Sequence, residues 1–377
     1  MKVLYIGYYK EDSDWGKITS NNILALDAAG IDVVCRNFKL TKDRDITGRL
    51  KELEQKDTQN CDVCIQHLLP HHLVGTEKFK KNIAFLETES ISIKHLPWFE
   101  NLQQMDEVWV PNTQLKNALD DDTLEVPVSV VPHAFDIGTY IRKYPDIKIP
   151  EAEGQFKFYF IGDWSHRQNI DSIVSCFHSE FDKSENVALI LKVRQFGVDP
   201  EQLRSRVDAM LGSVKESLRM YDNARDYKKD ITITADVSEE NTYSLHQYCD
   251  CFISTSHGES WPMSAFDAMA FGNTPICSDF GGAQEFITED ENTGKRIEGT
   301  YSTCRCTDSP FKDVFTGREN WFVPCEHQTK RQMRKYYEQH KKDTIQTKRE
   351  AKIAGLKRAQ DFSYEKVGNK MKELLNV

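Results

Sequence analysis

The sequence predicts an α/β protein with two doubly wound parallel sheets. Three observations lead to this fold class. The chain has 377 residues, more than a single hydrophobic core usually holds, so two domains are expected. Short, almost continuous apolar runs alternate with helical or polar segments, as is typical of parallel strands covered by helices on both faces. A segment rich in proline and charge interrupts this pattern at residues 144–155, and the pattern then begins again.

The first domain is expected to span residues 1–148. Its first strand is "KVLYIGYY", and the segment "SNNILALDAAG" predicts a capped amphipathic helix that begins at Ser20 and ends at Gly30. Further strands of this domain are predicted in the apolar runs "IDVVCRNF", "CDVCIQH", "KNIAFLE", "DEVWVPN" and "VSVVPHAFD".

The second domain is expected to span residues 149–355, and a C-terminal helix within 356–377 is expected to pack back on the first domain. Strands of the second domain are predicted in "FKFYFIGDW", "VALILKV", "ITITADV", "CFISTS" and "TPICSDF". We expect the two domains to face one another across an interdomain cleft at the carboxyl ends of their strands, where sheets of this kind bind ligands.

Composition and charge indicate a soluble cytoplasmic protein. The net charge is −10, from 49 Lys and Arg against 59 Asp and Glu, which disfavours binding of nucleic acid or anionic lipid over the whole surface. No apolar run is long enough to cross a bilayer, and the N-terminus lacks the pattern of a signal peptide. One segment, residues 329–358, is strongly basic. It is either a solvated helix face or a docking patch for a polyanion or a membrane surface.

The ten cysteines are expected to be reduced thiols. The segment "CDVC" places Cys61 and Cys64 near His67, which is a pattern seen in metal sites. However, no second CxxC or HxxxH pair completes a set of four ligands. We therefore expect no metal site.

The most informative feature of the second domain is a carboxylate inside an apolar helix. The run "CFISTS" predicts a buried strand, "HGES" a turn, and "PMSAFDAMAF" a helix that Gly272 ends. Asp267 lies in this helix, which is apolar on nearly every side, and Glu259 lies in the turn before it. A buried carboxylate is costly unless a partner satisfies it.

The position of the two carboxylates suggests a ligand. Glu259 precedes the helix at the carboxyl end of a strand, where ligands bind in this fold class. A carboxylate accepts hydrogen bonds from two adjacent hydroxyls, as on ribose or hexose, and the backbone amides at the helix start (residues 260–263) suit a diphosphate. These features point to a nucleotide sugar. The alternative is a helix cap at Glu259 and an internally satisfied Asp267.

The spacing Glu259-x7-Asp267, followed by "AMAFGNTPICSDFGG", resembles the E-x7-E motif of the family-4 retaining glycosyltransferases, which have the GT-B fold. Shorter segments follow in the family's order along nearly the whole chain: "DEVWVPN", "VVPHAFD", "FIGDWSHRQNIDSIVSCF" and "DFSYEKV". The resemblance implies that Glu259 binds the donor sugar's hydroxyls and that Asp267, one methylene shorter than the family's Glu, binds the ribose. It also implies that Gly16 permits close approach of donor or acceptor.

The diphosphate clamp departs from the family's pattern. Asp163 and Gln168 stand where many members have Arg and Lys. The resemblance therefore implies Arg167, one residue before the missing Lys, as a substitute, and Lys192 at the end of the next strand as a second cation.

A second carboxylate is expected to act from the first domain. Aligning "IAFLETES" with the family places Glu87 where a His often faces the reacting sugar, although a solvated loop explains Glu87 equally well. His133 is explained at least as well by a core or hinge position as by ligand binding.

Together these features predict a retaining glycosyltransferase that moves a sugar from a nucleotide-sugar donor to an unidentified acceptor without a metal. The donor is a substrate, so no cofactor is expected. The catalytic residues are predicted to be Glu259, Glu87 and Arg167. The donor-binding residues are predicted to be Gly16, Gly162, Arg167, Lys192, Gly258, Glu259, Ser260, Trp261, Pro262, Met263 and Asp267. Two alternatives stay open: a sugar-nucleotide epimerase of the same fold, and a non-catalytic protein that binds nucleotide sugars.

Overall fold

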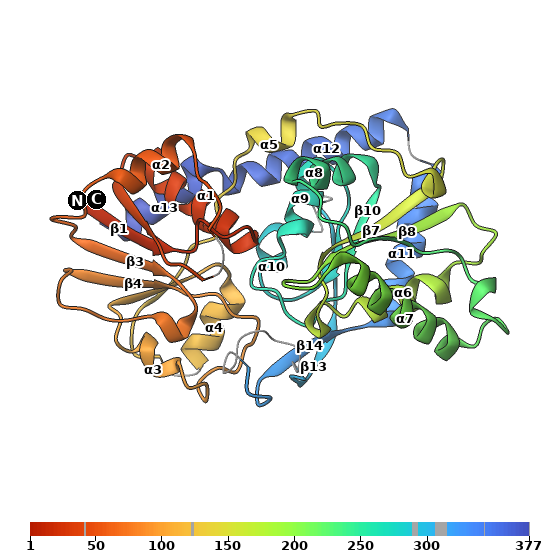
Figure 1. The fold of residues 1–377 in the computed structure, drawn as a ribbon, viewed down its shortest axis with the longest axis horizontal. Helices are drawn as coiled ribbons and strands as arrows, with labels where there is room; N and C mark the ends of the chain where they lie inside the picture. The colour runs from red at the N-terminus through yellow and green to blue at the C-terminus, as the bar shows by residue number, and fades with distance from the viewer. Residues whose placement is uncertain (41–42, 122–123, 289–292, 306–314, 343, 377) are drawn as a thin grey trace. The chain divides into compact units, whose positions relative to one another are not determined.

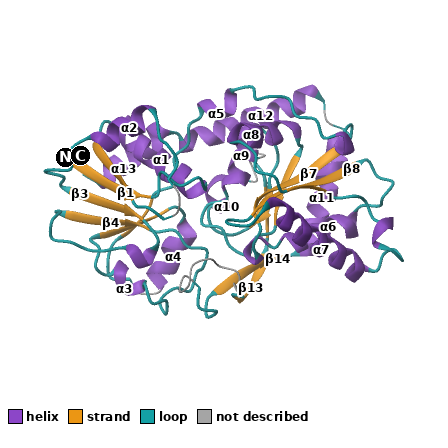
Figure 2. Cartoon of the chain, in the orientation of Figure 1, coloured by secondary structure: helices purple, strands orange, loops and turns teal. Residues whose placement is uncertain are grey.

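The computed structural model describes residues 1–40, 43–121, 124–288, 293–305, 315–342 and 344–376. These form two compact units. Unit 1 contains the described residues of 1–139, 315–320 and 359–376, and unit 2 those of 140–305 and 321–358. Each unit has one large parallel sheet with helices on both of its faces (Figures 1 and 2). The units divide after Thr139, whereas the sequence suggested residue 148.

Unit 1 contains a six-stranded parallel sheet in the order β2-β1-β3-β4-β5-β6. The strands are β1 (Lys2–Gly7), β2 (Asp32–Asn37), β3 (Val63–His67), β4 (Lys81–Phe85), β5 (Glu107–Val110) and β6 (Val128–Val130). Each overlaps a predicted run. Alternate residues face opposite sides of the sheet, so Val3 and Tyr5 join one core cluster while Leu4 joins another.

The helices of unit 1 cover the sheet on both faces. They are α1 (Asp14–Ala28), α2 (Gly48–Gln55), α3 (Phe99–Leu102), α4 (Thr113–Asp121) and α13 (Tyr364–Leu374), with the short η1 (Pro70–His72) and η6 (Gln360–Phe362) and α5 (Gly138–Ile141) at the boundary. In Figure 1, α1, α2 and α13 lie on one face and α3 and α4 on the other. The predicted start of α1 at Ser20 is wrong. Ser13 caps the helix by accepting from Gly16 N–H at 3.3 Å, while Ser20 donates to the Gly16 carbonyl inside the helix.

The C-terminal helix α13 packs against α1 within unit 1. The contact is close because of Gly368, where a Cβ atom would lie 2.0 Å from the Ala25 carbonyl oxygen. The Tyr364 hydroxyl adds a 2.7 Å hydrogen bond to Asn21 Oδ1. Chain segments from both ends of the sequence therefore build one domain core.

Unit 2 contains a second six-stranded parallel sheet in the order β12-β11-β10-β7-β8-β9. Its strands are β7 (Phe156–Asp163), β8 (Val187–Arg194), β9 (Ile231–Ile233), β10 (Cys251–Ser254), β11 (Ile276–Ser278) and β12 (Lys295–Ile297). A separate pair joins β13 (Gly299–Thr303) to β14 (Asn320–Pro324). Strands β7 to β11 each overlap a predicted run. Strands β12 to β14 were not predicted, because they are short and carry polar residues.

The helices of unit 2 form two groups. They are α6 (Ile170–Glu180), α7 (Pro200–Leu218), α8 (Glu239–Tyr248), α9 (Met263–Phe271), α10 (Ala283–Phe286), α11 (Glu326–His340) and α12 (Ile345–Ala359), with η2 (Pro150–Ala152), η3 (His166–Gln168) and η4 (Ala224–Asp226). Helices α6, α7 and α11 pack together, and α8 packs against α9. Helix α9 is buried on nearly all sides, as predicted, and Gly272 ends it with φ of 92°.

The basic segment 329–358 forms most of α11 and α12. Arg334 on α11 is paired with Glu180 and Glu185, whereas Lys348, Arg349 and Lys352 on α12 are exposed. The predicted contact with a polyanion or membrane surface stays a prediction. In the described part of the chain, none of the helices has the length and apolar character needed to cross a bilayer.

Candidate functional site

The turn that carries Glu259 connects β10 to α9 at the carboxyl edge of the sheet in unit 2. Two glycines hold this turn. A Cβ atom at Gly281, whose φ is +62°, would lie 1.8 Å from the Glu259 carbonyl oxygen, and one at Gly282 would lie 2.7 Å from that of Ser260. The Gly-Gly pair therefore allows the backbone after β11 to touch the turn. The position of Glu259 is fixed by the packing of two loops.

A second segment, η3 after β7, is held against the same turn. Asn169 has φ of 52° and follows η3; its side chain donates to the Thr255 carbonyl at 2.9 Å, and the Thr255 hydroxyl donates to the Asn169 carbonyl at 2.8 Å. The backbone N–H of His257 donates to the Arg167 carbonyl at 2.8 Å. These bonds place two loops side by side although they are far apart in the sequence.

Arg167 and Gln168 both contact Glu259. Arg167 Nη1 lies 2.9 Å from Glu259 Oε1 and donates to the Gly258 carbonyl at 2.6 Å. Gln168 Nε2 donates to the same carboxylate oxygen at 2.6 Å. The side chains of Arg167 and Glu259 are 18% and 19% exposed, so a ligand can reach them. Arg167 and Gln168 thus orient the carboxylate.

The cations at the end of β8 differ in their surroundings. Arg194 is paired with Asp163 at 2.9 Å, and both side chains are largely exposed. Lys192 is buried, with 6% of its surface exposed, and burial lowers the pKa of its ammonium group. Among the described residues, no hydrogen bond or ion pair is found for that ammonium group. A buried cation of this kind is suited to an anionic ligand.

Asp267 faces the interior of unit 2. It is 5% exposed, and its Oδ1 accepts a hydrogen bond from the Tyr140 hydroxyl at 2.7 Å. Tyr140 in turn packs edge-to-face on Phe271 with ring centroids 5.3 Å apart. This geometry matches the alternative of an internally satisfied carboxylate, and the predicted ribose contact stays a prediction.

The other predicted donor-binding residues also contribute to the packing of their own units. Trp261 is buried and packs against Phe286, with ring centroids 5.5 Å apart. A Cβ atom at Gly162 would lie 2.6 Å from the Phe160 ring, and one at Gly16 would lie 2.0 Å from the Glu11 carbonyl oxygen. Both glycines are therefore required by their own domains. Ser260 and Met263 are buried, and Pro262 stands at the N-cap position of α9.

In unit 1, Glu87 lies directly after β4 between two imidazoles. Its Oε1 is 2.6 Å from His67 Nε2, and its Oε2 is 3.4 Å from His133 Nε2. The Glu87 side chain is 10% exposed and that of His133 is fully buried. Glu87 was a predicted site residue, but its two partners were not predicted, because His67 and His133 lie far from it in the sequence.

The hydrogen bonds around the two imidazoles define their tautomers. Asn22 Oδ1 accepts from Ala134 N–H at 3.1 Å, so Asn22 Nδ2 faces His133 Nδ1 at 3.3 Å and donates to it. The Tyr5 hydroxyl lies 3.0 Å from His67 Nδ1. Burial raises the pKa of Tyr5 well above its ordinary value, so Tyr5 stays protonated and can donate. Both imidazoles then carry a proton on Nε2. His67 donates to Glu87 Oε1 at 2.6 Å, and His133 Nε2 faces Glu87 Oε2 at 3.4 Å.

These contacts explain the titration of the cluster. Burial alone would raise the pKa of Glu87, but the two imidazoles more than offset burial, so the pKa of Glu87 lies well below its usual range. Burial lowers the pKa of His67. At neutral pH, Glu87 is therefore ionised and His67 is neutral.

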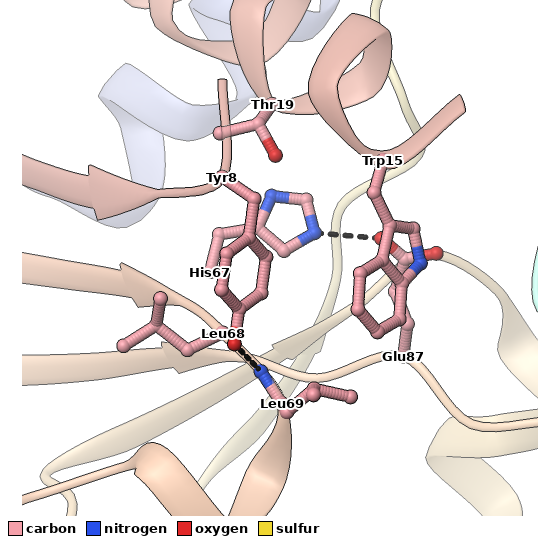
Figure 3. Close-up of a pocket in the computed structure, with 7 residues that line it drawn as sticks. All are labelled: Tyr8, Trp15, Thr19, His67, Leu68, Leu69 and Glu87. Carbon is pink, nitrogen blue, oxygen red and sulfur yellow. Dashed lines mark hydrogen bonds and ion pairs between the residues drawn. The ribbon is translucent and has the colours of Figure 1, made fainter. Parts of the chain in front are cut away.

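A small pocket opens beside this carboxylate (Figure 3). It is lined by Tyr8, Trp15, Thr19, His67, Leu68, Leu69 and Glu87. Tyr8 and Trp15 stack with ring centroids 5.5 Å apart and an interplanar angle of 10°. The Tyr8 hydroxyl accepts from Leu69 N–H at 2.8 Å and lies 3.0 Å from His72 Nδ1. The pocket thus combines two aromatic rings with a buried carboxylate.

The sequence-predicted residues fall into separate groups in the two units. Glu259, Arg167 and Gly258 come together in unit 2, while Glu87 lies in unit 1. Cys61 and Cys64 are buried in a small core cluster with Leu4 and Val34. Within the described ranges, His, Cys, Asp and Glu side chains form no group of three that could hold a metal ion.

Comparisons with known proteins give a partial family match and a fold. Residues 145–300 match the family model described as glycosyl transferases group 1, a segment that includes Arg167, Lys192 and Glu259. No curated protein sequence matches the chain.

Several solved structures have the same fold. Anabaena HepE in complex with UDP is 14% identical, with a TM-score of 0.62 over 100% of both chains. Sucrose-phosphate synthase from Thermosynechococcus elongatus is 13% identical, with a TM-score of 0.63 over 100% of this chain and 98% of that one. A structure from E. coli, described as trehalose-6-phosphate bound with UDP-2-fluoro glucose, is 9% identical, with a TM-score of 0.67 over 100% of this chain and 99% of that one. The predicted fold class is therefore confirmed: two doubly wound, Rossmann-like domains as in GT-B glycosyltransferases.

Proposed function

We propose that this protein is a glycosyltransferase that moves a sugar from a nucleotide-sugar donor to an acceptor hydroxyl, with retention at the anomeric carbon. The observation that carries the proposal is the Glu259 carboxylate, held by Arg167 and Gln168 at the start of α9. This arrangement lies within the segment that matches the group 1 glycosyl transferases. The Glu-x7-Asp spacing, which resembles the motif of retaining family-4 enzymes, supports retention.

The chemistry assigned to unit 2 is binding of the donor and stabilisation of its leaving group. The bond from the anomeric carbon to the diphosphate oxygen breaks, and the acceptor oxygen forms a bond to that carbon on the same face. Charge develops on the diphosphate, and the Lys192 ammonium, the Arg167 guanidinium and the backbone amides at the start of α9 are suited to meet it. The proposal needs no metal ion, since these groups supply positive charge.

The role assigned to Glu87 is hydrogen bonding to a sugar hydroxyl and not removal of a proton. Its pKa lies well below the usual range, because the two imidazoles offset the effect of burial, and a carboxylate of this kind is a weak base. The acceptor's proton passes instead to an oxygen of the departing diphosphate. Glu87 would still accept a hydrogen bond from a hydroxyl and fix its position.

The donor we propose is a UDP-hexose. Support comes from the solved structures of the same fold: Anabaena HepE is described in complex with UDP and with UDP-glucose, and the E. coli structure with UDP-2-fluoro glucose. A non-catalytic protein that binds nucleotide sugars is the second candidate. It is favoured by one observation: Arg167 and Gln168 both contact Glu259. Lys192 would then be the main cation that binds the donor's diphosphate.

The test uses the purified full chain and the glucose conjugates of UDP, GDP, ADP and TDP. Calorimetry measures donor binding, release of nucleoside diphosphate measures turnover, and proton NMR of the product gives the anomeric configuration. We expect UDP-glucose to bind and to release UDP when an acceptor is added. Binding without release, in wild-type protein and with every acceptor, supports the second candidate. Conversion of the donor sugar without an acceptor supports an epimerase. Inverted product contradicts retention.

A further inference from the structure

The pocket beside Glu87 has a composition that selects between classes of acceptor. Its lining holds two aromatic side chains, two leucines, a threonine hydroxyl, an imidazole and a carboxylate. These residues lie at the carboxyl ends of β1, β3 and β4 and on α1. This edge of a doubly wound sheet is where ligands bind. Among the seven described residues that line it, none is lysine or arginine, and His67 is kept neutral by burial.

We propose that a neutral, unphosphorylated sugar binds as the acceptor at the mouth of this pocket, whose interior has room for about one water molecule. The inference rests on the proposed glycosyltransferase function and deepens it by naming the acceptor class. Two features carry it, the Glu87 carboxylate and an aromatic wall. In this wall Tyr8 and Trp15 line the pocket, and Phe38 and His72 pack beside them.

The aromatic wall fits the apolar face of a sugar ring. Trp15 is half-buried and stacks on Tyr8, whose ring meets Phe38 edge-on at 5.9 Å. Phe38 is 36% exposed and stacks on His72 with centroids 4.8 Å apart. A pyranose has C–H groups on its faces and hydroxyls around its edge. It therefore suits a site with aromatic rings on one side and hydrogen-bonding groups on another.

Glu87 supplies the polar side of the pocket. Each carboxylate oxygen has two lone pairs, and each faces one imidazole N–H, so acceptor capacity is left for a sugar hydroxyl. Figure 3 shows the contact between His67 and the Glu87 carboxylate, both of which line the pocket together with Trp15. Thr19, which is buried, adds a hydroxyl from α1.

The same carboxylate disfavours phosphorylated acceptors. A phosphate dianion near ionised Glu87 is repelled, and the lining offers no cation to offset the repulsion. Two basic side chains of unit 1 are engaged elsewhere: Lys10 pairs with Glu54 at 2.7 Å, and Arg36 donates to the backbone carbonyls of Cys35 and Lys56. An acceptor that carries phosphate on a sugar or a lipid is therefore a poor match.

The experiment measures acceptor binding separately from donor chemistry. The full chain, saturated with UDP, is titrated by calorimetry with the methyl α-glycosides of glucose, galactose and mannose, and with glucose 6-phosphate. Titration of UDP alone reports on unit 2. We expect at least one glycoside to bind and glucose 6-phosphate to bind at least about tenfold more weakly, the effect of like charges a few ångströms apart. Tighter binding of glucose 6-phosphate, or no binding of any glycoside, overturns the proposal.

Variants locate the binding site. Trp15→Ala should weaken glycoside binding about tenfold or more and leave UDP binding unchanged, and Trp15→Phe should recover part of the loss because it keeps an aromatic ring. Phe196→Ala is the matched control, since Phe196 is an aromatic residue of unit 2 with 76% exposure. Unchanged glycoside binding in Trp15→Ala contradicts the assignment. If the wild-type protein binds a glycoside but does not bind UDP, the proposed glycosyltransferase function is contradicted, while the proposed sugar site is supported.

Discussion

Asn22 holds His133 in the tautomer that carries its proton on Nε2. The Asn22 amide cannot flip without loss of the 3.1 Å bond from Ala134 N–H to its Oδ1, so its Nδ2 points at His133 Nδ1. The imidazole proton is thereby directed at Glu87 Oε2, 3.4 Å away. An asparagine on α1 thus orients the carboxylate that lines the pocket, through a histidine that is itself fully buried.

The first prediction concerns this tautomer. Long-range proton–nitrogen NMR of the neutral imidazole should show the His133 proton on Nε2. Asn22→Ala should cost about 1–3 kcal/mol of unfolding free energy, because the buried Ala134 N–H and His133 Nδ1 both lose a partner. Asn186→Ala, which removes one exposed hydrogen bond to the Gly154 carbonyl, is the control and should change stability by less than about 0.5 kcal/mol. A spectrum with the proton on Nδ1 would contradict the assignment.

The second prediction concerns pH. Burial lowers the pKa of His67, so below its unfolded value of 6.5 the unfolded chain binds more protons and stability falls as the pH falls. The pKa of Glu87 is also lowered, because the imidazoles outweigh burial, so its contribution is lost only below its unfolded value of 4.5. The melting temperature should therefore drop on going from pH 7.5 to 5.5. His67→Gln should show a shallower drop, and His166→Gln, which replaces an exposed histidine, should match wild type.

The fold could be predicted from sequence because buried parallel strands are nearly continuous apolar runs, such as "VALILKV" within β8. Gly272 was likewise recognisable as a helix end. The contacts of the site could not be predicted in this way. From the sequence, Gln168 was interpreted only as standing in place of a phosphate-binding lysine. In the structure its Nε2 lies 2.6 Å from Oε1 of Glu259, which is 91 residues away in the sequence. Such partners are chosen by the packing of loops, and neither periodicity nor spacing encodes them.

The third prediction tests the Glu259 carboxylate. Glu259→Gln should lower kcat by roughly 100-fold or more, since an amide cannot accept hydrogen bonds through both of its terminal atoms from donor hydroxyls, Arg167 and Gln168. Donor binding should persist. Glu298→Gln is a matched control, because Glu298 is an exposed carboxylate that also accepts from a glutamine, Gln328, at 2.8 Å. Turnover of Glu259→Gln within about twofold of wild type at saturating donor would remove Glu259 from the mechanism.

The fourth prediction separates two roles for Asp267. Because its Oδ1 accepts from the buried Tyr140 hydroxyl at 2.7 Å, Asp267→Asn and Tyr140→Phe should each destabilise the protein by about 1–3 kcal/mol. The double variant should cost less than the sum, since the two residues share one interaction. Chemical denaturation measures all three. If Asp267→Asn instead raises the donor KM about tenfold with an unchanged melting temperature, Asp267 binds the ribose as the sequence motif suggested.

The last prediction compares two buried lysines of unit 2. Lys215 Nζ lies 2.5 Å from Asp230 Oδ2, and Asp230 also bonds His178 at 2.8 Å, so Lys215→Met leaves a buried carboxylate with one partner fewer. We expect this variant to lose about 3–5 kcal/mol of stability. Lys192 has no such bond among the described residues, so Lys192→Met removes the cost of burying its charge and should gain about 0.5–2 kcal/mol.

Measurements of UDP binding test whether Lys192, despite the cost of burying its charge, contacts the donor. If its ammonium group meets the donor's diphosphate, Lys192→Met should weaken UDP binding about tenfold or more, the effect of one lost charge-assisted hydrogen bond, and leave uridine binding unchanged. Calorimetric titration of both ligands into wild type and variant gives the answer. A stabilised variant with normal UDP affinity would show that Lys192 does not bind the diphosphate. Arg194, which is paired with Asp163, would then be the next residue to substitute.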